Sequence, residues 1–255
     1  MDVFLDIFFT VAGAAVGSFL NVLICRIPEG QSIVFPASHC PKCMHAIRFY
    51  DNIPIISYLV LRGKCRDCHE KISLRYPIVE AITALLSLLL FWKFGLGLKY
   101  LFSFIFTCAL IVITFIDFDH QIIPDVISLP GIPLFFLLAV FFMDVPVLEA
   151  LLGIFIGGGC LFAIAFSYEL ITKREGMGGG DIKLLAMLGA FLGWKSLFFI
   201  LFVSSLLGAF VGISMMIAKG KDMKYAVPFG PFLSIAAVVY LFVGVDAMNY
   251  LYFHY

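Results

Sequence analysis

Long apolar runs dominate this chain, and they constrain its fold more than any other feature. A helix needs about 20 apolar residues to cross the hydrocarbon core of a bilayer. Of the 255 residues, 62% are hydrophobic and 13% are charged, whereas a soluble domain carries about 25% charged residues. The sequence therefore predicts an all-α polytopic membrane protein. Eight runs are expected to span the bilayer: 3–25, 78–94, 99–116, 126–143, 147–170, 182–194, 196–218 and 228–250.

The first and sixth runs need separate comment. The first has no basic segment before it and exceeds the length of a signal-peptide core, so it is interpreted as a retained span. Its Gly13 and Gly17 form G-x-x-x-G, which is typical of close helix packing. The run at 182–194 is short, and it is expected to be a tilted half-helix or one arm of a hairpin broken at Gly193. Seven spans are therefore an alternative to eight.

The positions of Lys and Arg predict the orientation of the spans, because cytoplasmic loops carry an excess of both. Fourteen of the 17 basic residues fall in the segments 26–76, 117–125, 171–183 and 219–227. These segments are assigned to the cytoplasm, and the N-terminus is assigned to the periplasm. The formal net charge is zero, so it gives no sign of a nucleic-acid partner, and none is expected.

One long connection, 26–76, carries two C-x-x-C pairs separated by 21 residues. Four thiolates at such spacing can surround a tetrahedral zinc ion. Disulfides are an alternative that the reducing cytoplasm disfavours, and reduced thiols without a metal also stay open. The ligands would be Cys40, Cys43, Cys65 and Cys68.

A zinc ion in this connection would be structural, because four sulfurs leave no position for an activated water. Metal binding would stabilise a segment of about 50 residues that is too short for a sufficient core of its own. The sequence thus predicts three parts: a first transmembrane helix at 1–25, a cytoplasmic zinc-binding domain at 26–76, and a multi-span domain at 77–255.

Acidic residues gather where the third run ends, in TFIDFDHQIIPDVISLPG at 114–131. Such residues at a membrane edge are costly unless they are solvated, paired or functional. Asp117 ends the apolar run and is expected to lie deepest, whereas Asp119 and His120 are expected in a water-facing loop. Asp125 is expected to cap the next helix, with Pro124 and Pro130 marking the turn and the helix start.

Asp181 follows a cluster of glycines at 176, 178, 179 and 180. An N-cap is one interpretation of this aspartate. A cap does not require four glycines, which permit positive φ and a close approach of another backbone. An extended peptide could therefore lie beside Asp181. Two carboxylates on one membrane face suggest aspartyl hydrolysis, with one protonated and one ionised, although the residues alone leave open whether Asp117 and Asp181 meet.

Five motifs occur in the same order as in a known family: GSFLNVLICRIP at 17–28, the paired C-x-x-C, RYPIVE at 75–80, IDFDHQIIPD at 116–125 and GMGGGD at 176–181. The chain closely resembles the bacterial type IV prepilin peptidases. These are GxGD aspartic proteases of the inner membrane, the leader peptidase/N-methyltransferases of pilus and type II secretion systems. The resemblance extends over nearly the whole chain.

The resemblance implies that Asp117 and Asp181 are the catalytic pair and that Gly178 and Gly180 belong to the active-site loop. It implies substrates that are prepilins or pseudopilins, cleaved after the Gly that ends a short basic leader, on the cytoplasmic side of the lipid bilayer.

Many family members then methylate the new N-terminus with S-adenosylmethionine. For this second activity Glu29, Arg75 and Glu80 are candidates by position only. Glu80 could instead complement the dipole of a helix that begins near Pro77.

Two other functions compete with this one. A transporter or channel could use acidic residues along an ion or proton pathway, but that function explains neither the cysteine pairs nor the glycines. A zinc-bearing scaffold of a secretion assembly would tolerate Asp→Asn changes at both aspartates.

Overall fold

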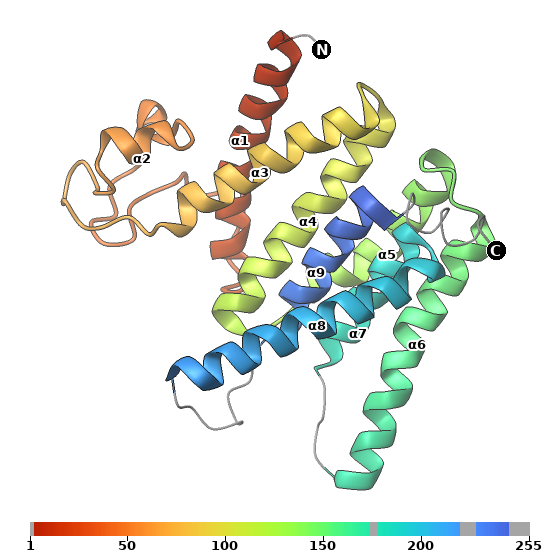
Figure 1. The fold of residues 1–255 in the computed structure, drawn as a ribbon. Coiled ribbons are helices and arrows are strands. Elements are labelled where there is room, and N and C mark those ends of the chain that lie inside the picture. Colours follow the sequence, from red (N-terminus) through yellow and green to blue (C-terminus); the bar gives the residue numbers. More distant parts are fainter. Residues whose placement is uncertain (1–2, 174–177, 220–227, 245–255) are drawn as a thin grey trace. The chain divides into compact units, whose positions relative to one another are not determined.

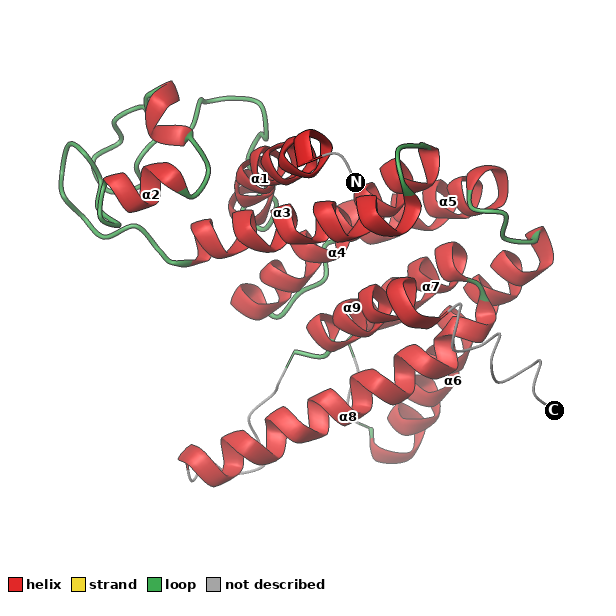
Figure 2. Cartoon of the chain, turned by 45° about the horizontal axis from the view of Figure 1, so that its top comes forward, coloured by secondary structure: helices red, strands yellow, loops and turns green. Residues whose placement is uncertain are grey.

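The computed structural model describes residues 3–173, 178–219 and 228–244, and its regular elements are all helices. Figure 1 follows these helices along the chain, and Figure 2 marks the loops between them. The predicted all-α class is confirmed. The elements are α1 (Val3–Arg26), η1 (Phe49–Asn52), α2 (Ile56–Val60), α3 (Arg75–Phe94), α4 (Leu98–His120), α5 (Asp125–Phe142), α6 (Val147–Thr172), α7 (Gly179–Leu192), α8 (Trp194–Lys219), α9 (Gly230–Val239) and η2 (Tyr240–Gly244).

Six of the described helices are long and apolar enough to cross a membrane, namely α1, α3, α4, α5, α6 and α8. Two other predicted runs correspond to shorter apolar helices, because α7 has 14 residues and α9 with η2 covers only Gly230–Gly244. The end of the last run, 245–250, lies outside the described residues. The count of eight spans therefore stays a prediction. The predicted break at Gly193 is confirmed, since its φ of +78° separates α7 from α8.

Residues 1–112 form one compact unit, in which α1 packs against α3. A Cβ on Gly13 would come 2.6 Å from the Cβ of Ser87, and one on Gly17 would come 2.8 Å from the Cα of Glu80. Small residues allow two helix backbones to approach this closely. The close packing predicted from G-x-x-x-G is therefore confirmed.

The segment between α1 and α3 contains η1 and α2 and is otherwise irregular among the described residues. Because α1 ends at Arg26 and α3 begins at Arg75, this segment corresponds closely to the expected zinc-binding domain. The predicted boundaries 1–25, 26–76 and 77–255 themselves stay a prediction.

Residues 113–255 form the second unit, and α7 packs there against α5, α6 and α8. Residues 184–191 of α7 are all buried, as expected for a helix that is apolar on every side. At its contact with α6, a Cβ on Gly153 or Gly189 would overlap the backbone of the other helix. Protein therefore surrounds α7, which fixes its N-terminus and Asp181.

The start of α5 differs from expectation in two respects. Pro124 occupies the N-cap position without a side-chain cap bond, and Pro130 lies inside the helix. The predicted cap at Asp125 is wrong, because its carboxylate pairs instead with Lys183, whose Nζ lies 2.7 Å from Oδ1. The predicted role of Pro130 is wrong as well, since membrane helices tolerate an internal proline when neighbouring groups satisfy the freed carbonyl.

Candidate active site and metal centre

Asp117 lies in the last turn of α4 and is only 5% exposed. Its Oδ2 accepts a hydrogen bond from the backbone N–H of Gly230 at 3.1 Å. Gly230 is the first residue of α9, and the N-terminus of a helix presents unpaired N–H groups that favour an anion. A Cβ on Gly230 would come 2.6 Å from this oxygen, so glycine is the residue that permits the bond. The expectation that Asp117 lies deep is confirmed.

Asp181 is the third residue of α7, and Gly178 occupies the N-cap position. The backbone N–H of Asp181 donates to the Gly178 carbonyl at 3.2 Å, and the helix has no side-chain cap bond. Asp181 is therefore not the N-cap, and its carboxylate is not engaged in capping. Gly178 has a φ of −64°, so it adopts an ordinary conformation. Gly176 lies outside the described residues.

Position 180 is a glycine because the side chain of Ile123 lies very close to it. A Cβ there would come 2.9 Å from the Cβ of Ile123, and the Cδ1 of Ile123 in turn would lie 3.1 Å from a Cβ on Gly230. Ile123 thus separates the glycine that precedes Asp181 from the glycine that binds Asp117. Sequence analysis did not single out Ile123.

The two carboxylates interact electrostatically. Burial and, as the smaller cause, the negative charge of Asp117 together raise the pKa of Asp181 to about 6. Asp181 precedes the apolar part of α7 and lies outside the six long spans. Like charges that share a site cannot both ionise easily.

Asp119 and His120 lie at the end of α4 and are exposed. They belong to the helix, so the expectation that they lie in a loop is wrong, although their exposure to solvent is confirmed. The helix continues past Asp117 because Gln121, with a φ of +54°, is the first residue that leaves the helical conformation. Its N–H still donates to the Asp117 carbonyl at 2.9 Å.

The four cysteines of the two pairs form one cluster. Their sulfur atoms all lie within 4.8 Å of one another, and the sulfurs of Cys40 and Cys68 are 3.8 Å apart. A tetrahedron with zinc–sulfur bonds of 2.3 Å has edges of about 3.8 Å, so the spacing fits a metal ion. All seven cysteines of the chain are free thiols. The disulfide alternative is therefore not what the structure shows.

The two pairs have the same local fold. After the first, the N–H of Met44 donates to the Cys40 carbonyl at 2.9 Å, and after the second, the N–H of His69 donates to the Cys65 carbonyl at 3.0 Å. Met44 and His69 both adopt positive φ, which turns the chain back around the sulfurs. The backbone N–H of Cys43 lowers the pKa of the Cys40 thiol to about 7, whereas burial and the neighbouring cysteines raise the pKa of the Cys68 thiol to about 12.

The three candidates for the methyl donor have different surroundings. Glu29 is exposed and accepts a bond from Gln31 at 2.6 Å. Arg75 begins α3 and donates to the sulfur of Cys25 at 2.9 Å. Glu80 is 8% exposed and accepts the N–H of Ile55 at 2.7 Å.

Glu80 lies in the second turn of α3, so the helix-dipole interpretation does not apply to it.

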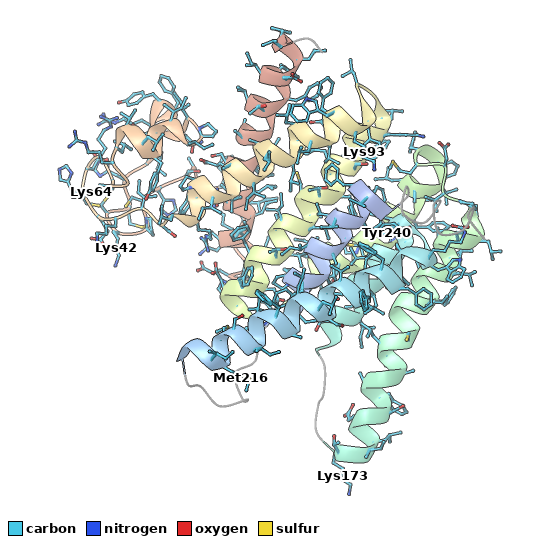
Figure 3. The ribbon with its side chains drawn as sticks, viewed as in Figure 1. Lys42, Lys64, Lys93, Lys173, Met216 and Tyr240 are labelled. Atoms are coloured by element: carbon cyan, nitrogen blue, oxygen red, sulfur yellow. The ribbon has the colours of Figure 1, made fainter. Side chains whose placement is uncertain are left out.

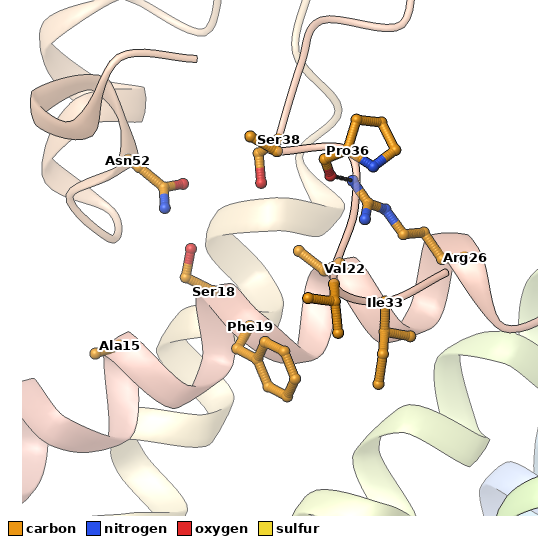
Figure 4. Close-up of a pocket in the computed structure, with 11 residues that line it drawn as sticks. Ala15, Ser18, Phe19, Val22, Arg26, Ile33, Pro36, Ser38 and Asn52 are labelled. Carbon is orange, nitrogen blue, oxygen red and sulfur yellow. Dashed lines mark hydrogen bonds between the residues drawn. The ribbon is translucent and has the colours of Figure 1, made fainter. Parts of the chain in front are cut away.

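A pocket of about 270 Å³ lies beside α1 (Figure 4). Its polar groups come from Ser18, Ser38 and Asn52, and its apolar wall includes Phe19 and Val22 from α1. None of the three methyl-donor candidates lines it. The Ser18 hydroxyl, however, is placed to bond the Glu80 carboxylate, so Glu80 lies directly behind the pocket wall.

Arg26 also lines this pocket and orders the segment that closes it. Its Nη1 donates to the Ser32 carbonyl at 2.8 Å and its Nη2 to the Pro36 carbonyl at 2.7 Å. Figure 4 shows the second of these bonds. A buried guanidinium that saturates two carbonyls fixes the backbone of residues 32–36 against α1.

Comparison with known proteins agrees with this arrangement. The bacterial peptidase A24 N-terminal domain matches residues 11–94, and the type IV leader peptidase family matches residues 104–213. The chain belongs to the type IV leader peptidase family. No solved structure matches it significantly.

Several curated relatives carry the name prepilin leader peptidase/N-methyltransferase. The relative from Pseudomonas putida is 40% identical over 89% of this chain and 86% of its own length. That from Aeromonas hydrophila is 40% identical over 90% and 87%, and that from Neisseria gonorrhoeae is 42% identical over 89% and 86%. These relatives confirm the resemblance and the enzyme class, and they give no support to a transporter. With its six apolar helices, this family member is a multi-pass inner-membrane protein.

Proposed function

We propose that this protein is an aspartyl peptidase that removes the short basic leader of type IV prepilins or pseudopilins after a glycine. Asp117 and Asp181 are its catalytic pair. The observation that carries the proposal is the electrostatic coupling of the two carboxylates at the ends of α4 and α7. The family and the names of its relatives supply the substrate class.

The two aspartates take different roles in hydrolysis. Asp181 carries the proton, because its pKa is raised to about 6 by burial and by the charge of Asp117. Asp117 is ionised, with one oxygen bound by the Gly230 N–H. Asp117 takes a proton from a water molecule, which attacks the scissile carbonyl carbon, while Asp181 donates its proton to the carbonyl oxygen. The proton on Asp117 then passes to the leaving amine as the C–N bond breaks.

The glycines before Asp181 make room for the substrate. Among the described residues, no atom lies within 4 Å of a Cβ placed on Gly179, and the nearest atom to one on Gly178 is Asp181 Oδ2 at 3.8 Å. An extended peptide can therefore approach the carboxylate at this helix start. A substrate helix must unwind before hydrolysis, and unwinding is easiest at the membrane edge. Gly178 at the N-cap leaves space beside Asp181, and Gly180, which lies in the first turn of α7 and not in a loop, contacts Ile123.

Cys40, Cys43, Cys65 and Cys68 would hold a structural zinc ion. Four thiolate ligands suit zinc and would leave no position for an activated water. Metal binding would supply folding energy to a segment with little core.

S-adenosylmethionine is the proposed donor for methylation of the new N-terminus, and when bound it supplies an activated methyl group. The pocket beside α1 combines hydroxyl and amide groups with an apolar wall, which suits a small molecule with polar and apolar parts. Ser18 and Asn52 would hold the molecule, and Glu80 would orient Ser18. Arg75 and Glu29 stay candidates on the same unit of the chain.

The zinc segment and the catalytic pair are proposed to face the cytoplasm, with the N-terminus in the periplasm. The excess of Lys and Arg in the corresponding segments supports this orientation. Prepilin leaders are basic and precede an apolar helix, so a cytoplasmic site would meet them where they leave the bilayer.

A cleavage assay tests the proposal. The purified protein in lipid vesicles is incubated with a prepilin, and loss of the leader is followed by mass spectrometry. Asp117→Asn and Asp181→Asn should each abolish cleavage, whereas Asp119→Asn, an exposed position on the same helix end, should retain it. Retained cleavage in either of the first two variants would overturn the assignment of the pair. Addition of S-adenosylmethionine should raise the mass of the mature product by one methyl group.

A further inference from the structure

Helix α2 has its apolar side turned outward. Ile56, Leu59 and Val60 share one face of the helix and are 58%, 67% and 69% exposed. Ser57, on another face, is buried, and its hydroxyl donates to the Tyr50 carbonyl at 3.0 Å. A helix on a soluble domain buries its apolar face and exposes its polar one. The orientation of α2 is the reverse.

The preceding turn extends this apolar surface. Phe49 in η1 is 88% exposed and Ile53 is 45% exposed. The turn is held to α2 because the Ile53 N–H donates to the Ser57 Oγ at 3.1 Å. The apolar patch is defined as Phe49, Ile53, Ile56, Leu59 and Val60. Contiguous apolar patches of this kind on a protein surface mark sites of interaction with protein or membrane.

Basic and aromatic side chains lie next to the patch. The guanidinium groups of Arg48 and Arg66 lie 5.9 Å and 5.5 Å from the centre of the Tyr50 ring. Arg66 also pairs with Asp51 at 2.6 Å. Tyrosine and arginine combine an apolar body with a polar end, and both favour the boundary between lipid headgroups and acyl chains.

The segment that carries the patch is joined at both ends to membrane spans, α1 before it and α3 after it. It therefore cannot leave the vicinity of the bilayer surface. In the common view of Figures 1 and 3, α2 lies toward the N-terminal end of α1, which is the direction into the membrane. Lys42, on one of the cysteine turns, lies on the opposite side of the segment.

We propose that the apolar patch docks onto the bilayer that α1 and α3 cross. Its side chains enter the outer acyl-chain region, and Arg48 and Arg66 lie at the level of anionic lipid headgroups. A short apolar face with basic residues beside it is the pattern of interfacial binding. Docking holds the metal centre against the membrane surface, so that the segment does not swing on its two connections.

Tryptophan quenching in vesicles tests the proposal on the full chain. The chain has two tryptophans, Trp92 and Trp194, and both are first changed to Phe. Val60→Trp is then introduced as the probe and Lys42→Trp as the matched control in the same segment. Each variant is checked for metal content and reconstituted in plain vesicles or in vesicles with lipids brominated near the headgroup.

The proposal expects the fluorescence of the Val60→Trp variant to fall about twofold in brominated vesicles, as for a side chain at the acyl boundary. The Lys42→Trp variant should be unchanged. Equal fluorescence of Val60→Trp in both kinds of vesicle would overturn the proposal, because the probe would then not contact lipid. The patch would instead be exposed to water, or it would pack against another part of the chain or a second copy. Equal quenching of both variants would overturn the proposed orientation.

A second experiment tests whether the arginines beside the patch bind anionic lipid. Removing phosphatidylglycerol from the vesicles should reduce quenching of the Val60→Trp probe, and Arg48→Gln should make quenching insensitive to that lipid. Quenching that does not depend on anionic lipid in either background would overturn the role given to the arginines.

Discussion

The cysteine cluster and the carboxylate pair are built in opposite ways. Each pair of cysteines is formed by a turn of a few residues, and the same hydrogen bond recurs in both turns. Asp117 instead lies at the end of α4 and Asp181 at the start of α7, 64 positions apart, and the two carboxylates interact electrostatically. The cysteine cluster is assembled from local turns, and the carboxylate pair from the packing of helices.

This contrast has a physical consequence. The cysteine segment has little buried apolar surface, so the proposed metal ion would supply much of its stability. The carboxylate pair depends on close contacts at Gly180, Gly230 and Ile123, which leave no space for an added methyl group. Changes in one region should therefore leave the other intact.

The largest effect is expected from removing either carboxylate. Asp117→Asn or Asp181→Asn should lower kcat/KM for leader removal about ten-thousandfold, because acid or base catalysis is lost. Zinc content, measured by elemental analysis, should be unchanged, since the metal centre forms independently. A parallel loss of zinc would show that the two regions do not fold separately.

The next largest effect is expected from removing one thiolate from the cysteine cluster. Cys40→Ser or Cys65→Ser should weaken zinc binding about a thousandfold, because each thiolate supplies a quarter of the coordination shell. Hydrogen exchange should then become fast in residues 38–72, while the buried residues 184–191 of α7 stay protected. Loss of protection in α7 would contradict the independence of the regions.

A methyl group on Gly230 tests the packing of the catalytic pair. Its Cβ would lie 2.6 Å from Asp117 Oδ2, so Gly230→Ala must displace the carboxylate, and kcat should fall about a hundredfold. Gly212→Ala is the matched control, because nothing lies within 4 Å of a Cβ at that position of α8. Equal activity of the two variants would rule out the bond from Gly230 as a positioning contact.

The pH dependence tests the division of roles within the pair. The pKa of Asp181 is raised to about 6, so its protonated form is present below that pH and is lost above it. In the proposed mechanism kcat should therefore fall about tenfold per unit well above pH 6. The profile belongs to the coupled pair, and Asp119→Asn should leave it unchanged. A rate that rises from pH 6 to 8 would contradict the role of Asp181 as the acid.

The smallest effect is expected at the ion pair of Asp125 and Lys183. Both side chains are partly exposed, 57% and 35% respectively, and such pairs contribute about 0–1 kcal/mol. Lys183→Met should reduce leader removal by less than about threefold, although Lys183 lies two residues after Asp181. A loss comparable to that of Gly230→Ala would show that the pair positions the start of α7.

Much of the architecture could be predicted from residues because its causes are local. Apolar runs indicated the positions of the helices, Gly193 indicated the break after α7, and the C-x-x-C spacing indicated a four-thiolate cluster. The error at Asp125 has a tertiary cause. Cap preferences describe one helix in isolation, whereas Lys183, 58 positions away, pairs with the Asp125 carboxylate.

By itself the sequence determined the helical class, the cysteine cluster and the identity of the two candidate acids, because hydropathy and motif spacing are properties of neighbouring residues. Only the tertiary structure decided that α9 begins beside Asp117, that Ile123 lies between Gly180 and Gly230, and that α2 turns its apolar face outward. Those features depend on contacts between segments that are distant in the chain, and no local preference encodes them.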